Sequence, residues 1–193
     1  NSQFMIKCLR PIFSAHDFDI EKITMKELYD YSGIDIHIYT VNVHLFDVES
    51  FSWKTHPDWR VLDVIYISSN IPLVFQPFRH PSTNHIYIDG GFCMNYPLKP
   101  CIQSVLEHGG KLNSILGIQL SLNGGCSQVL SESIEKNTTL LEYMYFIFNK
   151  MIWRLTNIDD VVDDTNLEKG RPHEIFVKMT KHATDVMSIL KYK

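Results

Sequence analysis

The segment Ile86-Tyr87-Ile88-Asp89-Gly90-Gly91 is the most informative stretch of this 193-residue sequence. Its three apolar residues indicate a very short strand that ends in a carboxylate, where open α/β sheets place their ligands. Glycine tolerates positive φ and lets another backbone come close, so the pair predicts a tight turn that presents Asp89 into a cleft. A carboxylate held there can act as a general base toward a serine hydroxyl. An ordinary surface turn is the alternative interpretation of the same tripeptide.

Helix and strand patterns alternate before this segment. Thr24 and Glu27 form a capping box, which predicts a short helix that Gly33 can end. Residues 34–45 then alternate like a strand, with a change of phase that fits a bend or two segments. Pro57 is expected to open a helix that runs to about residue 69.

The same alternation continues after the segment. We expect a helix over 97–108, a strand over 114–122, a long helix over 140–155 and a final strand over 175–177. Residues 1–20 show no clear period and receive no assignment. The rhythm predicts an α/β fold with a mostly parallel sheet flanked by helices.

Composition sets broad limits on function. The net charge of −4 gives no reason to expect a nucleic-acid partner, and no apolar run has the length of a membrane span. None of the four cysteines belongs to a C-x-x-C pair, so zinc and redox motifs are not indicated. Scattered thiols are typical of a cytosolic protein. We expect the protein to be cytoplasmic or peripheral at membranes. The cysteines are Cys8, Cys93, Cys101 and Cys126.

Three segments together resemble the patatin-like phospholipase family in order and spacing. They are ITMKELY at 23–29 with GIDI at 33–36, ISSNIPLVFQP at 67–77, and YIDGGFCMNYP at 87–97. The resemblance covers 22–122 and implies a patatin-like fold and hydrolysis of an acyl ester in a lipid or phospholipid by a Ser-Asp dyad. It implies no metal and no organic cofactor, and it allows transient contact with a membrane surface.

In that family a serine within G-x-S-x-G pairs with the aspartate of D-G-G, near a glycine-rich oxyanion loop. Asp89 matches the catalytic aspartate, and Gly90 and Gly91 complete its motif. This sequence contains no G-x-S-x-G and no glycine-rich loop before Asp89, so it supplies neither nucleophile nor oxyanion residues. We therefore expect residues 1–193 to be a partial patatin-like domain whose N-terminal part is absent, and inactive alone.

Two explanations of the missing serine stay open. The sequence is either a fragment of an enzyme or a natural serine-less protein, which would be a catalytically inactive lipid-binding or interaction module. The structure should place Asp89 at the end of its strand beside residues 68–72, with Gly90 or Gly91 at an unusual φ. The strands at 34–41 and 115–120 should share its sheet, and apolar side chains of the sheet should be unusually exposed.

Several other residues are assigned ordinary structural roles. His80 and His85 lack the spacing of zinc ligands, and Ser68 and Ser69 lack the glycines of a nucleophile elbow. The helix at 140–155 carries an apolar stripe that could contact lipid, although core packing is the simpler interpretation. The acidic pairs at 159–160 and 163–164 lack the EF-hand pattern of a calcium site. The glycosylation sequon at Asn137 matters only in a secreted protein.

Overall fold

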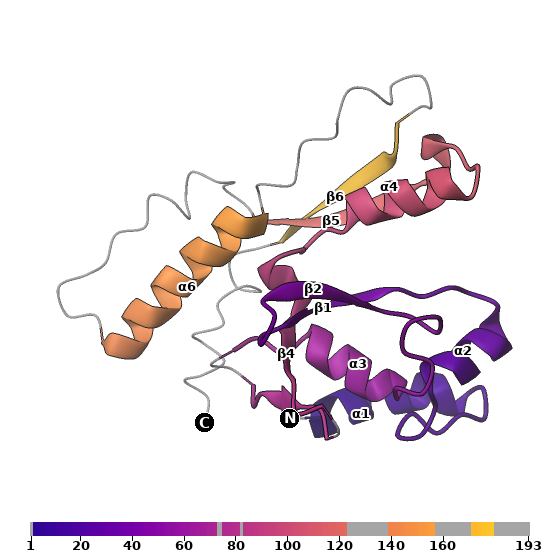
Figure 1. Ribbon diagram of the computed structural model, residues 1–193, viewed down its shortest axis with the longest axis horizontal. Helices are drawn as coiled ribbons and strands as arrows, with labels where there is room; N and C mark the ends of the chain where they lie inside the picture. Colours follow the sequence, from indigo (N-terminus) through magenta and orange to yellow (C-terminus); the bar gives the residue numbers. More distant parts are fainter. Residues whose placement is uncertain (1, 73–74, 82, 123–138, 157–170, 180–193) are drawn as a thin grey trace. The chain divides into compact units, whose positions relative to one another are not determined.

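The computed structural model describes residues 2–72, 75–81, 83–122, 139–156 and 171–179 (Figure 1). Helices and strands are mixed along the chain, with two short 3-10 helices among them. In order they are α1 (Ser2–Ser14), α2 (Met25–Ser32), β1 (Ile38–Asn42), β2 (Asp47–Phe51), α3 (Val61–Ser68), β3 (Phe78–Arg79), β4 (Ile86–Asp89), η1 (Gly90–Phe92), α4 (Leu98–Glu107), η2 (Leu112–Ser114), β5 (Leu116–Leu122), α6 (Leu140–Thr156) and β6 (His173–Met179).

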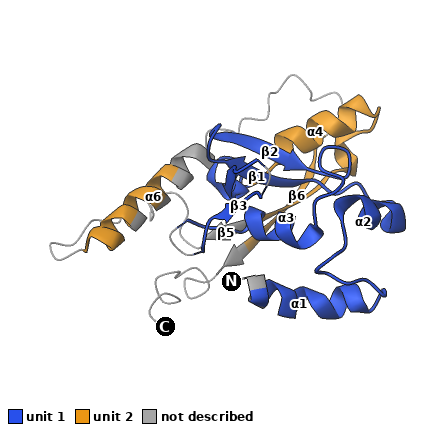
Figure 2. Cartoon of the chain, turned by 60° about the horizontal axis from the view of Figure 1, so that its bottom comes forward, with its two compact units in different colours: residues 1–95 blue, residues 96–193 orange. Residues whose placement is uncertain are grey.

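The chain divides into two compact units, residues 1–95 and residues 96–193 (Figure 2). Asp89 and the turn that follows it belong to the first unit. The strands β5 and β6 belong to the second. Each unit is therefore described by itself.

The first unit is built on a four-stranded sheet in the order β2-β1-β4-β3. All three neighbouring pairs are antiparallel. The prediction of a mostly parallel sheet is wrong for this unit. The physical reason is the connections: four residues link β1 to β2 and six link β3 to β4, and such short links join only antiparallel strands.

The helices of the first unit supply its apolar core. Four residues of α3 are buried, and they pack with Phe51 of β2 and Tyr87 of β4. Residues of α1 and of the segment before α2 close the same cluster, and Figure 1 shows α3 lying alongside β1 and β4. Burial of these apolar side chains drives the packing of the helices on the sheet. The buried core consists of Ile20, Ile23, Met25, Phe51, Val61, Leu62, Val64, Ile67 and Tyr87.

Local sequence signals are confirmed most clearly at α2. The Thr24 hydroxyl accepts a hydrogen bond from the Glu27 amide at 3.2 Å, and the Thr24 amide donates to the Glu27 carboxylate at 2.8 Å. Gly33 ends the helix in the left-handed conformation, with φ of 66°. By contrast, α1 and β2 were not predicted, and α3 begins at Val61 rather than at Pro57.

The second unit contains a two-stranded parallel sheet of β5 and β6. Helices α4 and α6 and both strands confirm the predicted elements of this region. The prediction that the strand at 115–120 shares the sheet of β4 is wrong, because β5 pairs with β6 instead. The predicted strand at 34–41 is confirmed in part: β1, at Ile38–Asn42, pairs with β4, whereas residues 34–37 are not in a strand.

Candidate active site at Asp89

Asp89 is the last residue of β4, as predicted, and it caps the 3-10 helix that follows. Its carboxylate oxygen Oδ1 accepts a hydrogen bond from the Gly91 amide at 2.7 Å. The side chain is half-buried, and its residue pairs with Thr40 of β1. Asp89 is therefore held at the end of a paired strand and is not at the tip of a surface hairpin.

The environment of Asp89 changes the acidity of its carboxyl group. Burial raises the pKa of Asp89, and the hydrogen bond from the Gly91 amide lowers it by less. The net shift is upward, because burial in a medium of low polarity disfavours the charged form. A carboxylate of raised pKa holds a proton more strongly, which suits a group that accepts and returns a proton.

The segment after α3 lies beside Asp89, which confirms the predicted neighbourhood. The Asp89 amide donates to the Asn70 carbonyl at 3.0 Å. The Asn70 side-chain amide in turn donates to the carbonyls of Gln76 at 3.1 Å and Tyr87 at 3.4 Å. Asn70 thus ties the end of α3 to β4, a contribution that the sequence analysis missed because the N-I-P segment gives no signal for it.

The two serines of this segment have structural contacts. The hydroxyls of Ser68 and Ser69 each donate to the Ile65 carbonyl at 3.0 Å. Such bonds from a hydroxyl to a carbonyl one turn back are typical of serines at helix ends. The helix-end role is confirmed.

The glycines of the D-G-G motif act through close approach, not through an unusual φ. Among the described residues, only Gly33 and Gly109 are glycines with positive φ, so the prediction for Gly90 or Gly91 is wrong. A Cβ added at Gly90 would lie 2.2 Å from the Tyr39 carbonyl oxygen. The missing side chain therefore lets the turn pack directly on the backbone of β1.

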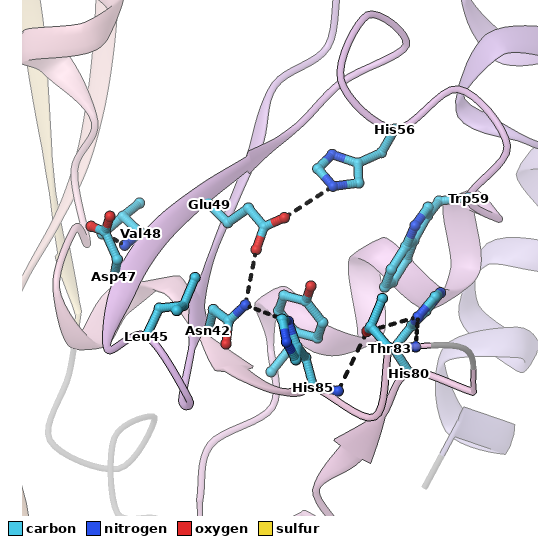
Figure 3. A pocket seen from close by; sticks show the side chains of 11 residues that line it. Asn42, Leu45, Asp47, Val48, Glu49, His56, Trp59, His80, Thr83 and His85 are labelled. Carbon is cyan, nitrogen blue, oxygen red and sulfur yellow. Dashed lines mark hydrogen bonds and ion pairs between the residues drawn. The ribbon is translucent and has the colours of Figure 1, made fainter.

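A separate pocket of about 370 Å³ lies at the opposite end of the sheet (Figure 3). Asp89 does not line it. In Figure 3 His56 and Asn42 point toward Glu49, at 3.0 Å and 3.3 Å from its two carboxylate oxygens. Burial, together with the charge and hydrogen bond of Glu49, raises the pKa of Tyr87 to about 12.

The histidines of this pocket have hydrogen bonds that oppose a metal interpretation. His80 Nδ1 accepts from the Thr83 amide at 3.2 Å, and His85 Nδ1 lies 3.0 Å from the Asn42 amide nitrogen. A metal-binding histidine instead donates through its second ring nitrogen. Within the described residues, no group of three or more His, Cys, Asp or Glu side chains is arranged to hold a metal ion.

The remaining candidate residues lie outside this site. Cys8 and Cys101 are exposed free thiols and Cys93 is half-buried, with its pKa raised by burial. The apolar stripe of α6 is largely exposed, from Leu140 to Met151. No helix among the described residues is long and apolar enough to cross a membrane. Cys126, Asn137 and the acidic pairs at 159–160 and 163–164 lie outside the described residues.

Comparison with known proteins decides the family. The sequence model of the family described as patatin-like phospholipase matches residues 3–102, which is just over half of the chain. The chain belongs to the patatin-like phospholipase family. The match lies at the N-terminal end of this chain and not in its C-terminal part. The predicted fold was a patatin-like domain with its N-terminal part absent and a mostly parallel sheet. That prediction is wrong, because the main sheet has four antiparallel strands and the family match covers residues 3–102.

A viral protein is similar to part of this patatin-like chain. "Probable lipid hydrolase 463L" of Invertebrate iridescent virus 6 is 31% identical over 81 residues, which are 42% of this chain. The matched region is 27% of the relative, so the chain spans about a quarter of its length. The patatin-like phospholipase family is a hydrolase family.

Proposed function

We propose that this chain supplies the general base of a lipid acyl hydrolase that acts through a Ser-Asp dyad on a glycerophospholipid ester. The observation that supports the proposal is the placement of Asp89. Its half-buried carboxylate ends β4 and is oriented by the Gly91 amide, within a chain of the patatin-like family. The serine and the oxyanion donors would come from residues outside this sequence, which contains no G-x-S-x-G.

The proposed reaction has two steps that use the same carboxylate. First, Asp89 accepts the proton of the serine hydroxyl while the serine oxygen attacks the ester carbonyl carbon. The tetrahedral intermediate collapses, and Asp89 returns the proton to the departing alcohol. Asp89 then accepts a proton from water, which attacks the acyl-serine. Collapse of the second intermediate releases the fatty acid, and the serine regains its proton.

A catalytically inactive lipid-binding or interaction module is the second candidate. The absence of G-x-S-x-G from all 193 residues favours it. Both candidates predict that the purified chain alone has no turnover on a p-nitrophenyl acyl ester, because general-base catalysis cannot replace a nucleophile and its oxyanion donors. Turnover that a serine-directed phosphonate abolishes would contradict both candidates.

The two candidates can be distinguished with the protein expressed from the whole reading frame that contains this sequence, including any residues encoded upstream of Asn1. If the dyad is assembled, Asp89→Asn should lower hydrolysis of a phosphatidylcholine vesicle at least about a hundredfold, the range for a positioned general base. The matched control is Asp58→Asn, at an exposed position of the same unit. Activity of the Asp89→Asn protein within threefold of the unsubstituted protein would reject Asp89 as the base. No activity in the unsubstituted protein would favour the binding module.

A further inference from the structure

The edge of β4 that faces β3 changes its partner at Asp89. β3 is only two residues long, and its register pairs Phe78 with Tyr87. Positions in an antiparallel pair run in opposite directions, so a continued ladder would place Gln76 opposite Asp89. The Asp89 amide donates instead to the Asn70 carbonyl at 3.0 Å. Asn70 therefore occupies the place of the next strand residue beside Asp89.

The side chain of Asn70 joins the two separating strands at this point. Its Nδ2 donates to the Gln76 carbonyl at 3.1 Å and to the Tyr87 carbonyl at 3.4 Å. Its main-chain carbonyl accepts from Asp89, so one residue uses both a donor and an acceptor here. Asn70 thus bridges Gln76 and Asp89, the two residues that the register would otherwise pair directly.

The end of α3 does not account for this side chain. The Asn70 amide donates to the Ile67 carbonyl at 3.3 Å, and the Ser69 amide donates to the Tyr66 carbonyl at 3.2 Å. Both bonds use main-chain atoms, so another side chain at position 70 could end the helix equally well. The asparagine is explained by its bonds toward β3 and β4.

The asparagine also carries a cost at this position. Asn70 is 1% exposed, and its Oδ1 makes no hydrogen bond in the part of the chain that the structure describes. A buried acceptor without a partner lowers stability, and a small apolar residue would avoid that loss. The donors of the amide must therefore hold something that an apolar residue could not.

We propose that Asn70 is a positioning residue of Asp89, which fixes the main chain at the end of β4 by bridging it to the segment before β3. On its other side Asp89 is fixed by its pairing with Thr40 of β1. Held from both sides, the main chain keeps the carboxylate where the Gly91 amide can orient it. The positioning matters for catalysis only if Asp89 is the base, so the inference rests on the proposed function.

The test is amide hydrogen exchange of the folded 193-residue chain, followed by NMR. Asn70→Ala removes the Nδ2 donor but keeps the main-chain carbonyl. The Asp89 and Gly91 amides should then exchange at least about tenfold faster, because both of their bonds depend on the position of the Asp89 main chain. The matched control is Ser69→Ala, whose hydroxyl donates to the Ile65 carbonyl, and it should leave both rates unchanged.

A purely structural role for Asn70 would give a different result. Val64→Ala removes a fully buried side chain of α3, so it should accelerate all globally exchanging amides by one common factor. In Asn70→Ala the Asp89 and Gly91 amides should instead accelerate more than those of Val41 and Ile88, which are paired in the same sheet. Uniform acceleration of all four amides, or an unchanged Gly91 amide, would overturn the proposal.

A measurement on the unsubstituted chain covers the case in which Asn70→Ala does not fold. The side-chain amide protons of Asn70 should be protected at least about tenfold relative to those of Asn84, an exposed asparagine of the same unit. Weaker protection would show that the bridge to Gln76 and Tyr87 is not maintained in solution, and the proposal would be rejected.

The exchange experiment and the activity assay fail independently. Selective exchange in Asn70→Ala, combined with full activity of the Asp89→Asn hydrolase, would support the bridge and reject the dyad. Uniform exchange, combined with an inactive Asp89→Asn hydrolase, would support the dyad and reject Asn70. If both proposals hold, Asn70→Ala should lower kcat at least about tenfold with little change in KM, because the base is displaced and the substrate contacts are not.

Discussion

At the scale of single residues, the candidate site depends on a carboxylate that the fold keeps partly away from water. Asp89 would be more stable in its ionised form at the surface, and burial raises its pKa. Proteins retain such groups where proton transfer requires them, so a half-buried carboxylate of raised pKa is a functional candidate. The buried Thr40 hydroxyl beside it is a second polar group that core packing alone would not select.

This environment predicts the pH dependence of an Asp89→Asn change. Because the folded pKa is raised, the ionised carboxylate lowers stability above that pKa, and the cost disappears below the unfolded pKa near 3.8. Asparagine keeps an acceptor for the Gly91 amide and carries no charge. Asp89→Asn should therefore be more stable than the unsubstituted chain at pH 7 and should match it near pH 3. Urea denaturation of both proteins at both pH values measures this difference. The explanation would be refuted if Asp89→Asn destabilised the chain more at pH 7 than at pH 3.

At the scale of elements, the turn after β4 is defined by the contact between Gly90 and β1. The adjacent Gly91 has a different environment, because a Cβ there would first meet side-chain oxygens of Asn95 at 3.0 Å and Asp89 at 3.1 Å. Side-chain atoms can move aside, whereas the Tyr39 carbonyl belongs to a paired strand. The two glycines of one motif therefore have different tolerances to substitution.

This difference gives a matched pair of variants. Gly90→Ala places a Cβ 2.2 Å from the Tyr39 oxygen, and the overlap should destabilise the chain by at least about 1–3 kcal/mol, as in other overpacked sites. Gly91→Ala should cost less. Equilibrium unfolding in urea, with the m value compared between variants, measures both. Equal destabilisation of the two variants would contradict the assigned contact.

At the scale of the whole molecule, the two compact units differ in how well their sheets are covered. The first unit buries Val41 and Phe51 completely. In the second unit, Leu116 and Ile118 of β5 are 62% and 60% exposed, and Phe176 of β6 is 59% exposed. Exposed apolar side chains were expected on the sheet that contains β4, and they are found instead on the separate sheet of β5 and β6. Parallel strands are normally covered on both faces, so this surface is unusual.

The exposed surface predicts binding of a hydrophobic dye by the folded chain. Anilinonaphthalene sulfonate should fluoresce with the native protein. Ile118→Ser together with Ile175→Ser should reduce the signal severalfold, because these two residues are partners in the register, are 60% and 50% exposed on the same face of the sheet, and contiguous apolar patches attract such ligands. Leu45→Ser, at an exposed position of the β1–β2 turn, is the control and should change the signal little. Dye fluorescence no higher than that of a fully packed globular protein would contradict the prediction.

The sequence by itself determined the features that depend on neighbouring residues in the chain. The capping box at Thr24, the left-handed stop at Gly33 and the strand end at Asp89 were all predicted, because each is produced by a few adjacent residues. The ordered motifs also identified the family, and they placed Asp89 beside the end of α3.

Only the tertiary structure decided which strands pair and in which direction. Alternation of apolar residues shows which face of a strand is buried, but a strand has the same alternation beside a parallel or an antiparallel neighbour. The pairing of β5 with β6, the contact of Gly90 with Tyr39 and the position of Thr40 opposite Asp89 all join residues distant in sequence. No local pattern encodes such contacts, because they depend on how the whole chain buries its apolar surface.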